Sequence, residues 1–229
     1  MNKTIDIFGI KLSTRSFKES IQWIEKRGQS GKATVVYCCT LNEIQMSEKD
    51  VLFKKMFDKA DLVTADGMPL VWGIRLRTGK GERVYGPDLM REMIYKNKEN
   101  HIFVGDKKNE KYFEKIGSYV VMPMMEKFTE KNYQSLTKKI KKMKGVIVWL
   151  GLGSRKQVEV AYELKKRGVN KVMITVGAAF DFLSGNKKQA PKWLRNMGGE
   201  WLFRLLNEPK RLIKRYLEIA LFLGRRLLS

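Results

Sequence analysis

The chain has 229 residues, 43% of them hydrophobic, which is enough for one large domain with or without an appendage. Its 46 Lys and Arg against 24 Asp and Glu leave a net charge of +22, which favours anionic partners such as nucleic acid, anionic lipid or phosphorylated substrates, although a lysine-rich composition alone explains part of the excess. Cys38 and Cys39 are the only cysteines and His101 is the only histidine, so a metal site built from Cys and His is excluded, and both thiols are expected to be buried and reduced.

The first residues of the chain, Met-Asn-Lys-Thr-Ile-Asp, lack the apolar core of a signal peptide. No later segment approaches the ~18–20 consecutive apolar residues that a membrane-spanning helix needs. We therefore expect a cytoplasmic protein, unless something tethers it to a membrane.

The N-terminal part of the chain predicts strands and helices in alternation, from hydrophobic periodicity and capping signals. The expected elements are a strand over 5–12 with a turn at Gly9, a helix from the capping box at Ser16 to Gly28, a buried strand over 34–39, and a helix from Thr40 to about Asp58.

The stretch from Ala60 to Trp72 places a carboxylate between a strand and a helix. Residues 62–64 suit a short buried strand, Gly67 allows a tight turn, and Pro69 suits the first turn of a helix. In open α/β sheets, ligands bind where strands end, so Asp66 is a candidate site residue. The alternative is that Asp66 only caps the helix, and this stretch by itself favours neither interpretation.

The remainder of the first 190 residues continues the alternation. We expect a basic, glycine-rich, mobile loop over 75–86, helices over 87–95, 133–143 and 156–167, and strands over 101–104, 118–122, 145–153 and 172–176. This order predicts an α/β protein with a Rossmann-like, mostly parallel sheet flanked by helices, and residues 1–190 as its main domain.

The composition changes after Pro191. Residues 191–229 contain nine Lys or Arg against three Glu, interleaved with Trp, Leu, Ile and Phe, and Pro209 divides them into at least two helical pieces. Basic amphipathic helices of this kind are typical of interfacial membrane anchors, so residues 191–229 are predicted to form a membrane-associating appendage. The alternative is a helical subdomain packed on the sheet.

Three strands are expected to end at glycine: Gly105 with Asp106, Gly151, and Gly177 followed by Asp181. Glycine exits beside helix N-termini suit phosphate, so a nucleotide site is indicated, although no single exit is a complete dinucleotide or P-loop motif. There is no Gly-x-Ser-x-Gly elbow, no Asp-x-Asp pair for a metal–nucleotide complex, and the lone His101 is more readily explained as structural. Carboxylates remain as candidate bases and Arg or Lys as charge stabilisers.

Eight segments of the chain resemble, in order, the motifs of one protein family: Thr40–Glu43, Ala60–Met68, Arg83–Leu89, Leu150–Gln157, Val176–Gly185, Ala190–Arg195, Glu200–Leu206 and Glu208–Arg211. These segments resemble the WecG/TagA/CpsF glycosyltransferases, and they span most of the chain. The resemblance implies an inverting, metal-independent hexosyltransferase that moves a sugar from a UDP-sugar to a polyprenyl-diphosphate-linked sugar, in cell-surface polysaccharide or teichoic-acid-type synthesis. It implies no cofactor beyond the UDP-sugar donor substrate.

The resemblance also implies roles for residues. The carboxylate at Asp66 becomes the proposed general base, with Asn42 and Arg83 beside it, and the C-terminal arginines are associated with the acceptor and the membrane. Together with the strand exits, the predicted substrate-binding residues are Thr40, Gly67, Gln157, Gly105, Gly151, Gly177 and Asp181. The predicted membrane or acceptor residues are Arg204, Arg211 and Arg215.

The expected partners are a UDP-sugar, a polyprenyl-diphosphate-linked acceptor and the anionic inner face of the cell membrane, to which the protein would bind peripherally from the cytoplasm. An exposed apolar tail also leaves a homo-oligomer open. The alternative of another class is a basic α/β nucleic-acid-binding protein without catalysis. The net charge favours it, but the chain has no ribonucleoprotein motif, helix-turn-helix or zinc spacing, so nucleic acid is not the expected partner.

Overall fold

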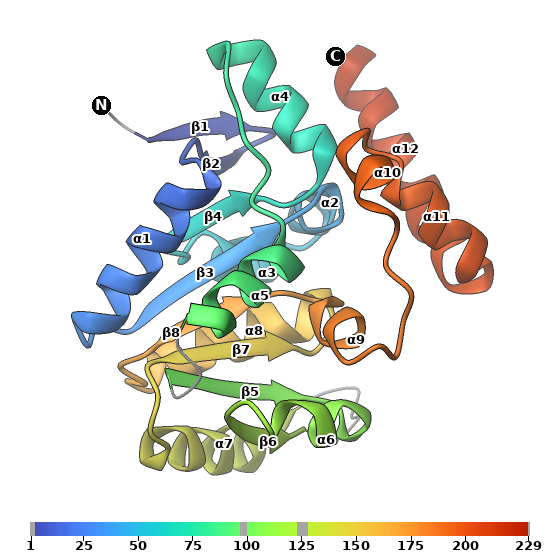
Figure 1. Ribbon diagram of the computed structural model, residues 1–229. Helices are drawn as coiled ribbons and strands as arrows, with labels where there is room; N and C mark the ends of the chain where they lie inside the picture. The colour runs from blue at the N-terminus through green and yellow to red at the C-terminus, as the bar shows by residue number, and fades with distance from the viewer. Residues whose placement is uncertain (1–2, 97–99, 123–127, 229) are drawn as a thin grey trace.

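The computed structural model describes residues 3–96, 100–122 and 128–228, and its centre is a parallel sheet of six strands (Figure 1). The strand order is β4-β3-β8-β7-β5-β6, and all neighbouring strands run parallel. The strands are β3 (Thr34–Cys39), β4 (Leu62–Ala65), β5 (His101–Gly105), β6 (Ser118–Val121), β7 (Ile147–Gly151) and β8 (Val172–Thr175). The predicted Rossmann-like α/β fold is confirmed.

Helices cover both faces of the sheet, because successive side chains of each strand point to opposite sides. One face packs against α2 (Leu41–Lys49), α3 (Val51–Phe57), α4 (Met68–Thr78), α7 (Glu130–Lys142) and α8 (Ser154–Lys166). The other face packs against α1 (Phe17–Gln29), α5 (Gly86–Lys96), α6 (Glu110–Phe113) and α9 (Ala179–Leu183), and the 3-10 helix η2 (Lys107–Asn109) precedes α6. Cys38 and Cys39 are both buried and, as predicted, belong to opposite faces.

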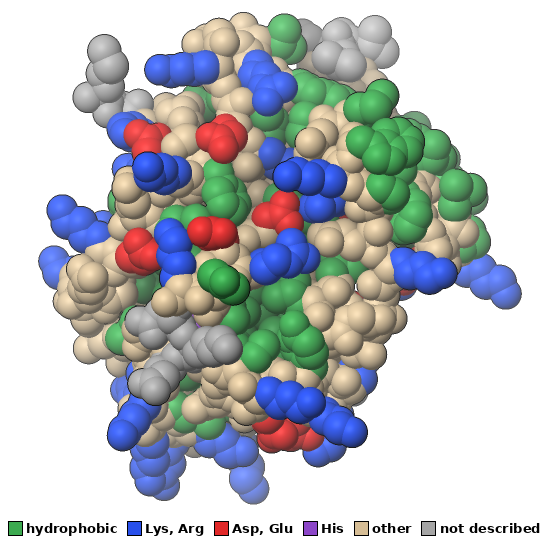
Figure 2. Space-filling view, in the orientation of Figure 1, with side chains coloured by type: hydrophobic (Ala, Val, Ile, Leu, Met, Phe, Trp, Pro, Cys, Tyr) green, Lys and Arg blue, Asp and Glu red, His purple; other side chains and the backbone are tan. Residues whose placement is uncertain are grey.

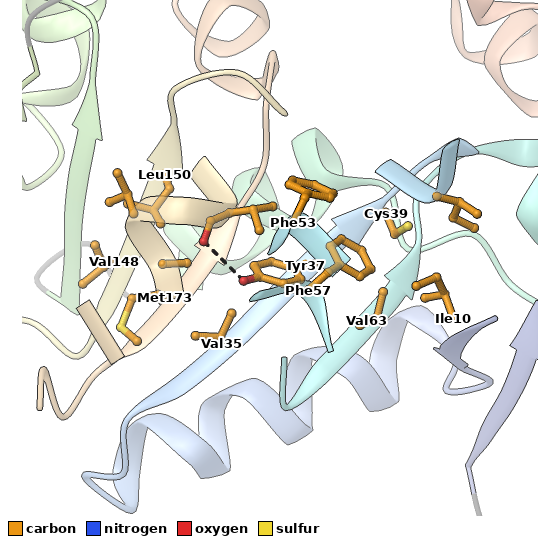
Figure 3. Packing of buried hydrophobic residues seen from close by; sticks show 14 of the residues in the cluster. Ile10, Val35, Tyr37, Cys39, Phe53, Phe57, Val63, Val148, Leu150 and Met173 are labelled. Carbon is orange, nitrogen blue, oxygen red and sulfur yellow. Dashed lines mark hydrogen bonds between the residues drawn. The ribbon is translucent and has the colours of Figure 1, made fainter. Parts of the chain in front are cut away.

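Aromatic side chains fill the core next to β3 (Figure 3). Tyr37 stacks on Phe57 with ring centroids 4.8 Å apart, and its hydroxyl donates a hydrogen bond of 3.4 Å to the carbonyl of Val158. On the opposite face, Trp149 Nε1 donates to His101 Nδ1 at 3.0 Å, while His101 Nε2 lies 3.2 Å from the carbonyl of Met93. The only histidine is therefore a structural residue of the core.

The N-terminal residues form a hairpin of β1 (Thr4–Ile7) and β2 (Ile10–Ser13), which pair antiparallel. Gly9 is in the left-handed region with φ of 78°, so the predicted turn is confirmed. The capping box of α1 is also present, since Ser16 accepts from the Glu19 amide and Glu19 accepts from the Ser16 amide.

Two local expectations are wrong. The helix expected from Thr40 to Asp58 is broken at Asp50, whose backbone is extended and whose carboxylate accepts the Phe53 amide at 3.0 Å to begin a new helix. The loop expected over 75–86 is present only over 79–85, because α4 continues to Thr78 and α5 begins at Gly86, and Val84 and Tyr85 within the loop are buried. Burial of these two side chains fixes the segment to the core.

The C-terminal residues form α10 (Lys192–Asn196), α11 (Glu200–Asn207) and α12 (Pro209–Leu228), which lie together along one side of the molecule (Figure 1). The helix α12 packs on the main domain through Phe222, which is buried edge-on against Phe8. Lys49 of α2 pairs with Glu218 at 3.1 Å. In the described part of the chain, no helix combines the length and the apolar character that crossing a membrane requires.

Candidate active site

A cavity of about 400 Å³ lies where β3, β4 and β8 end, and the C-terminal helices form its other wall. The parallel sheet brings these strand ends to one edge, so the residues that follow each strand meet there. The residues that line the cavity include seven of the predicted site residues: Thr40, Asn42, Asp66, Gly67, Arg83, Arg204 and Arg215.

Asp66 lies in this cavity as a nearly buried carboxylate, with 9% of the residue exposed. Its Oδ2 accepts the Gly86 amide at 3.3 Å, and its Oδ1 lies 3.6 Å from Arg83 Nη2. Arg83 Nε also donates to the Asp66 carbonyl. The helix α4 begins at Met68, and its N-cap residue is Gly67, with no side-chain hydrogen bond at the cap, so the alternative role of Asp66 as a helix cap is wrong.

The environment of Asp66 raises its pKa to about 7. Burial is the main cause, because it disfavours the charged form. The neighbouring Arg83 guanidinium lowers the pKa, and the negative charges of Glu200 and Glu43 raise it. A carboxyl group whose pKa lies near neutrality is suited to general-base catalysis.

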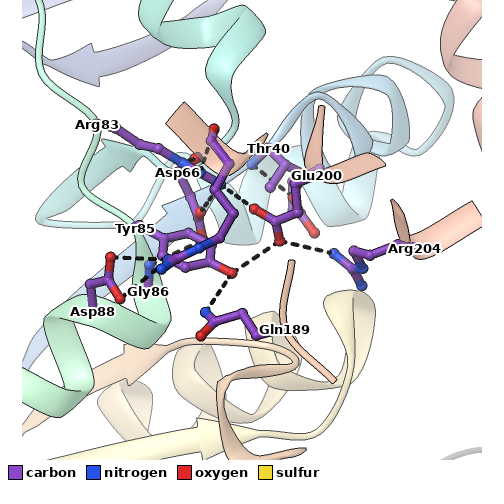
Figure 4. Close-up of polar contacts among 11 residues, drawn as sticks. Thr40, Asp66, Arg83, Tyr85, Gly86, Asp88, Gln189, Glu200 and Arg204 are labelled. Carbon is purple, nitrogen blue, oxygen red and sulfur yellow. Dashed lines mark hydrogen bonds and ion pairs between the residues drawn. The ribbon is translucent and has the colours of Figure 1, made fainter. Parts of the chain in front are cut away.

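Arg83 is shared between Asp66 and a carboxylate from the C-terminal helices (Figure 4). Its Nη2 lies 2.7 Å from Glu200 Oε2 on α11, closer than to Asp66. The hydroxyl of Tyr85 donates to Glu200 Oε1 at 3.0 Å, and Gln189 Nε2 donates to the Tyr85 oxygen at 3.0 Å. The Arg83 guanidinium stacks 4.0 Å from the centre of the Tyr85 ring.

Sequence analysis did not assign roles to Tyr85 and Glu200. Both lie inside segments that carried the family resemblance, so the motif was a usable signal for them.

Thr40 and Asn42 enter the cavity from the first turn of α2. Thr40 forms the N-cap, and its hydroxyl and amide both donate to Glu43 Oε2, at 2.7 and 2.9 Å. Asn42 Nδ2 donates to Glu43 Oε1 at 3.3 Å. The buried Glu43 carboxylate therefore fixes both side chains at the edge of the cavity.

Arginines of α11 and α12 give the opposite wall a positive charge. Arg215 is half-buried, and burial together with the nearby cations Arg211 and Arg204 lowers its pKa. Arg211 itself lies outside the residues that line the cavity and pairs with Glu208 at 2.5 Å. An anion between Arg204 and Arg215 would relieve their repulsion, so this wall suits a phosphate or diphosphate.

Gly105 and Gly151 lie away from the cavity lining and pack against Phe180 of α9. A Cβ atom on Gly105 would lie 2.7 Å from the Tyr119 hydroxyl oxygen, and one on Gly151 would lie 2.6 Å from Phe180 Cγ. These two glycines make room for a buried ring, and phosphate binding by them stays a prediction.

Gln157, Gly177 and Asp181 also lie outside the residues that line the cavity. Gln157 is buried and accepts the Gly177 amide at 2.9 Å, which holds the turn that leads into the cavity residues Ala178 and Ala179. Asp181 accepts from Asn109 Nδ2 at 3.1 Å and pairs with Lys108 at 2.9 Å. The structure thus gives Gln157 and Asp181 positioning contacts, and substrate contact by them stays a prediction.

Replacing Gly151 with Ala should destabilise the fold by about 1–3 kcal/mol, because the added methyl group overpacks the site of Phe180. The measurement is urea unfolding followed by circular dichroism. Gly224→Ala in α12 is the control, because a Cβ there meets open space. Equal unfolding midpoints for the Gly151 variant and wild type would contradict the packing role.

Among the residues that the structure describes, no three His, Cys, Asp or Glu side chains form a group that could hold a metal ion.

Comparison with protein families gives a match over nearly the whole length of the chain. The model of the Glycosyl transferase WecG/TagA/CpsF family matches residues 5–229. This range includes Asp66, Arg83 and Glu200 as well as α12.

Proposed function

Because the chain belongs to the WecG/TagA/CpsF glycosyltransferase family, whose members act in cell-surface polysaccharide synthesis, we propose that it transfers a hexose from a UDP-sugar to a polyprenyl-diphosphate-linked sugar, with inversion. The observation that carries this proposal is the buried Asp66 carboxylate, which shares one cavity with the Arg204 and Arg215 side chains. Family membership also favours a transferase over a nucleic-acid-binding protein.

In the proposed reaction, Asp66 accepts the proton of the acceptor hydroxyl as its oxygen attacks the anomeric carbon of the donor. The bond from that carbon to the UDP oxygen breaks, and UDP leaves with the electron pair. One carboxylate on the acceptor side is sufficient for such a single displacement. Cationic side chains and helix N-termini stabilise the negative charge of the departing diphosphate.

The surface of the C-terminal helices is an argument for a peripheral position of the protein at the inner face of the cell membrane. Their exposed surface carries large apolar side chains, namely Trp193, Met197, Trp201, Leu202, Leu206, Ile213, Leu217 and Leu221. Apolar residues interleaved with Lys and Arg are typical of helices that lie in a bilayer interface. A peripheral position there would bring the cavity to an acceptor whose polyprenyl chain lies in the lipid.

The proposed function is tested by incubating the full chain with radiolabelled UDP-sugars and polyprenyl-diphosphate-linked sugars in detergent. We expect transfer of label to the lipid from one of the donors, unchanged by EDTA, and an inverted anomeric configuration by NMR. Loss of transfer in EDTA would contradict metal independence. Absence of transfer and of UDP binding, together with salt-dependent binding of duplex DNA, would favour the nucleic-acid alternative.

A further inference from the structure

The helix α4 is apolar on two sides. Leu70, Val71 and Ile74 are buried in the core, yet Trp72 and Leu76 on the outside are 45% and 87% exposed. Trp72 and Leu76 are four residues apart and therefore share one helix face. A helix that packs on a core needs only one apolar stripe, so the outer one requires a separate explanation.

This outer face continues onto the C-terminal helices. The Trp72 ring lies against Gly198, between α10 and α11, where a Cβ would be 2.7 Å from its Cη2 atom. Exposed Trp193 and Met197 belong to the segment just before this contact. Figure 2 shows hydrophobic side chains gathered over the C-terminal helices and toward the side of α4 that lies next to them, with Lys and Arg over α4.

Cations flank the outer face of α4. Arg75, Arg77 and Lys80 are exposed, and none of them forms an ion pair with the residues that the structure describes. Arg75 Nε donates to the Gly81 carbonyl at 2.9 Å, and Arg77 Nη1 donates to the Asp6 carbonyl at 2.8 Å. Their charges thus remain available to an anionic surface, and an exposed Trp–Leu pair with a basic rim fits an anionic bilayer better than a neutral partner.

We propose that α4 is a membrane-inserting element of the main domain, so that the protein contacts an anionic bilayer through α4 as well as through its C-terminal helices. The inference rests on the proposed function only in taking a membrane as the partner.

Insertion of α4 into a bilayer would have a geometric consequence for catalysis. Met68 and Pro69 line the cavity, and Leu76 lies about 12 Å further along the same helix, at 1.5 Å per residue. Insertion of Leu76 would hold the mouth of the cavity next to the lipid surface.

The test uses the full chain with Leu76→Cys labelled by the environment-sensitive dye NBD, mixed with vesicles of phosphatidylglycerol and phosphatidylcholine. We expect a blue shift and an intensity increase on vesicle binding, because the dye enters an apolar environment. The control is Tyr95→Cys on α5, on the opposite face of the sheet, since Tyr95 is 85% exposed and should stay in water.

A second measurement uses substitution in place of a label. Leu76→Glu should weaken co-sedimentation with the same vesicles about tenfold or more, from the loss of one buried leucine, while Tyr95→Glu should not. Both variants should keep their activity on a short-chain acceptor in detergent, which separates this inference from the proposed function. Vesicle binding without a change in the Leu76 label would overturn the inference. The inference would also be overturned if Leu76→Glu dissociated an oligomer of the protein and left vesicle binding unchanged, because α4 would then face a second copy of the chain.

Discussion

Replacing Asp66 with Asn is expected to lower turnover by about 10²–10⁴-fold, because the amide cannot accept the proton of the acceptor hydroxyl. The fold should not suffer. The pKa of Asp66 is raised to about 7 by burial, so at pH 8 the folded protein holds a buried negative charge that Asn does not carry. The measurement is the rate of sugar transfer at saturating donor and acceptor, beside a melting curve at pH 8. Near-wild-type turnover would remove Asp66 from the role of base.

The wild-type pH profile gives an independent test of the same group. Asp66 acts as a base only when deprotonated, so kcat/KM should be level above about pH 7 and fall about tenfold per pH unit below it. A normal carboxyl group near pH 4 would place this decline some three units lower. A profile that stays level down to pH 5 would show that the titrating group is not Asp66.

Replacing Glu200 with Gln is expected to lower kcat by about 10–100-fold, which is the second large effect, although Glu200 lies on α11 and not on the sheet. Arg83 Nη2 is 2.7 Å from Glu200 and 3.6 Å from Asp66. Loss of the Glu200 charge would leave Arg83 to pair with Asp66, which ties up the base and disturbs the geometry on which catalysis depends.

The same substitution should also move the pH profile. The groups that face Asp66 are Arg83, which lowers its pKa, and Glu200 and Glu43, which raise it. Without the Glu200 charge, the pKa of Asp66 falls and the acid side of the profile shifts to lower pH. Glu208→Gln is the control, because Glu208 pairs with Arg211 and Lys187 and lies outside the residues that line the cavity. A lower kcat with an unshifted profile would mean that Glu200 supports the fold only.

Much of the fold could be predicted because its signals are local. The apolar run over residues 35–39 of β3 and the capping box at Ser16 are each contained within a few residues, and both are present as expected. The two local errors have different physical causes. At Asp50, a side-chain cap on the Phe53 amide, three residues further on, breaks the helix that the apolar pattern predicts. At Val84–Tyr85, burial overrides the loop pattern of the glycine-rich segment, and burial depends on neighbours distant in sequence.

The glycines that end β5 and β7, Gly105 and Gly151, show the same limit at the candidate site. A glycine at a strand exit predicts an open backbone for phosphate, but it equally makes room for a neighbouring ring. The sequence does not distinguish these uses, because Phe180 lies far from Gly105 along the chain. Only the packing of α9 on the sheet brings the ring against both glycines.

The sequence by itself determined that Asp66 ends a buried strand and precedes a helix, because hydrophobic runs, Gly67 and Pro69 are sufficient to set that local geometry. Only the tertiary structure decided what surrounds the carboxylate. The Arg83–Glu200 pair joins residues 117 positions apart, and it exists because α11 folds back over the ends of the parallel strands. The pKa of Asp66 follows from this burial and these charges, which no stretch of the chain contains alone.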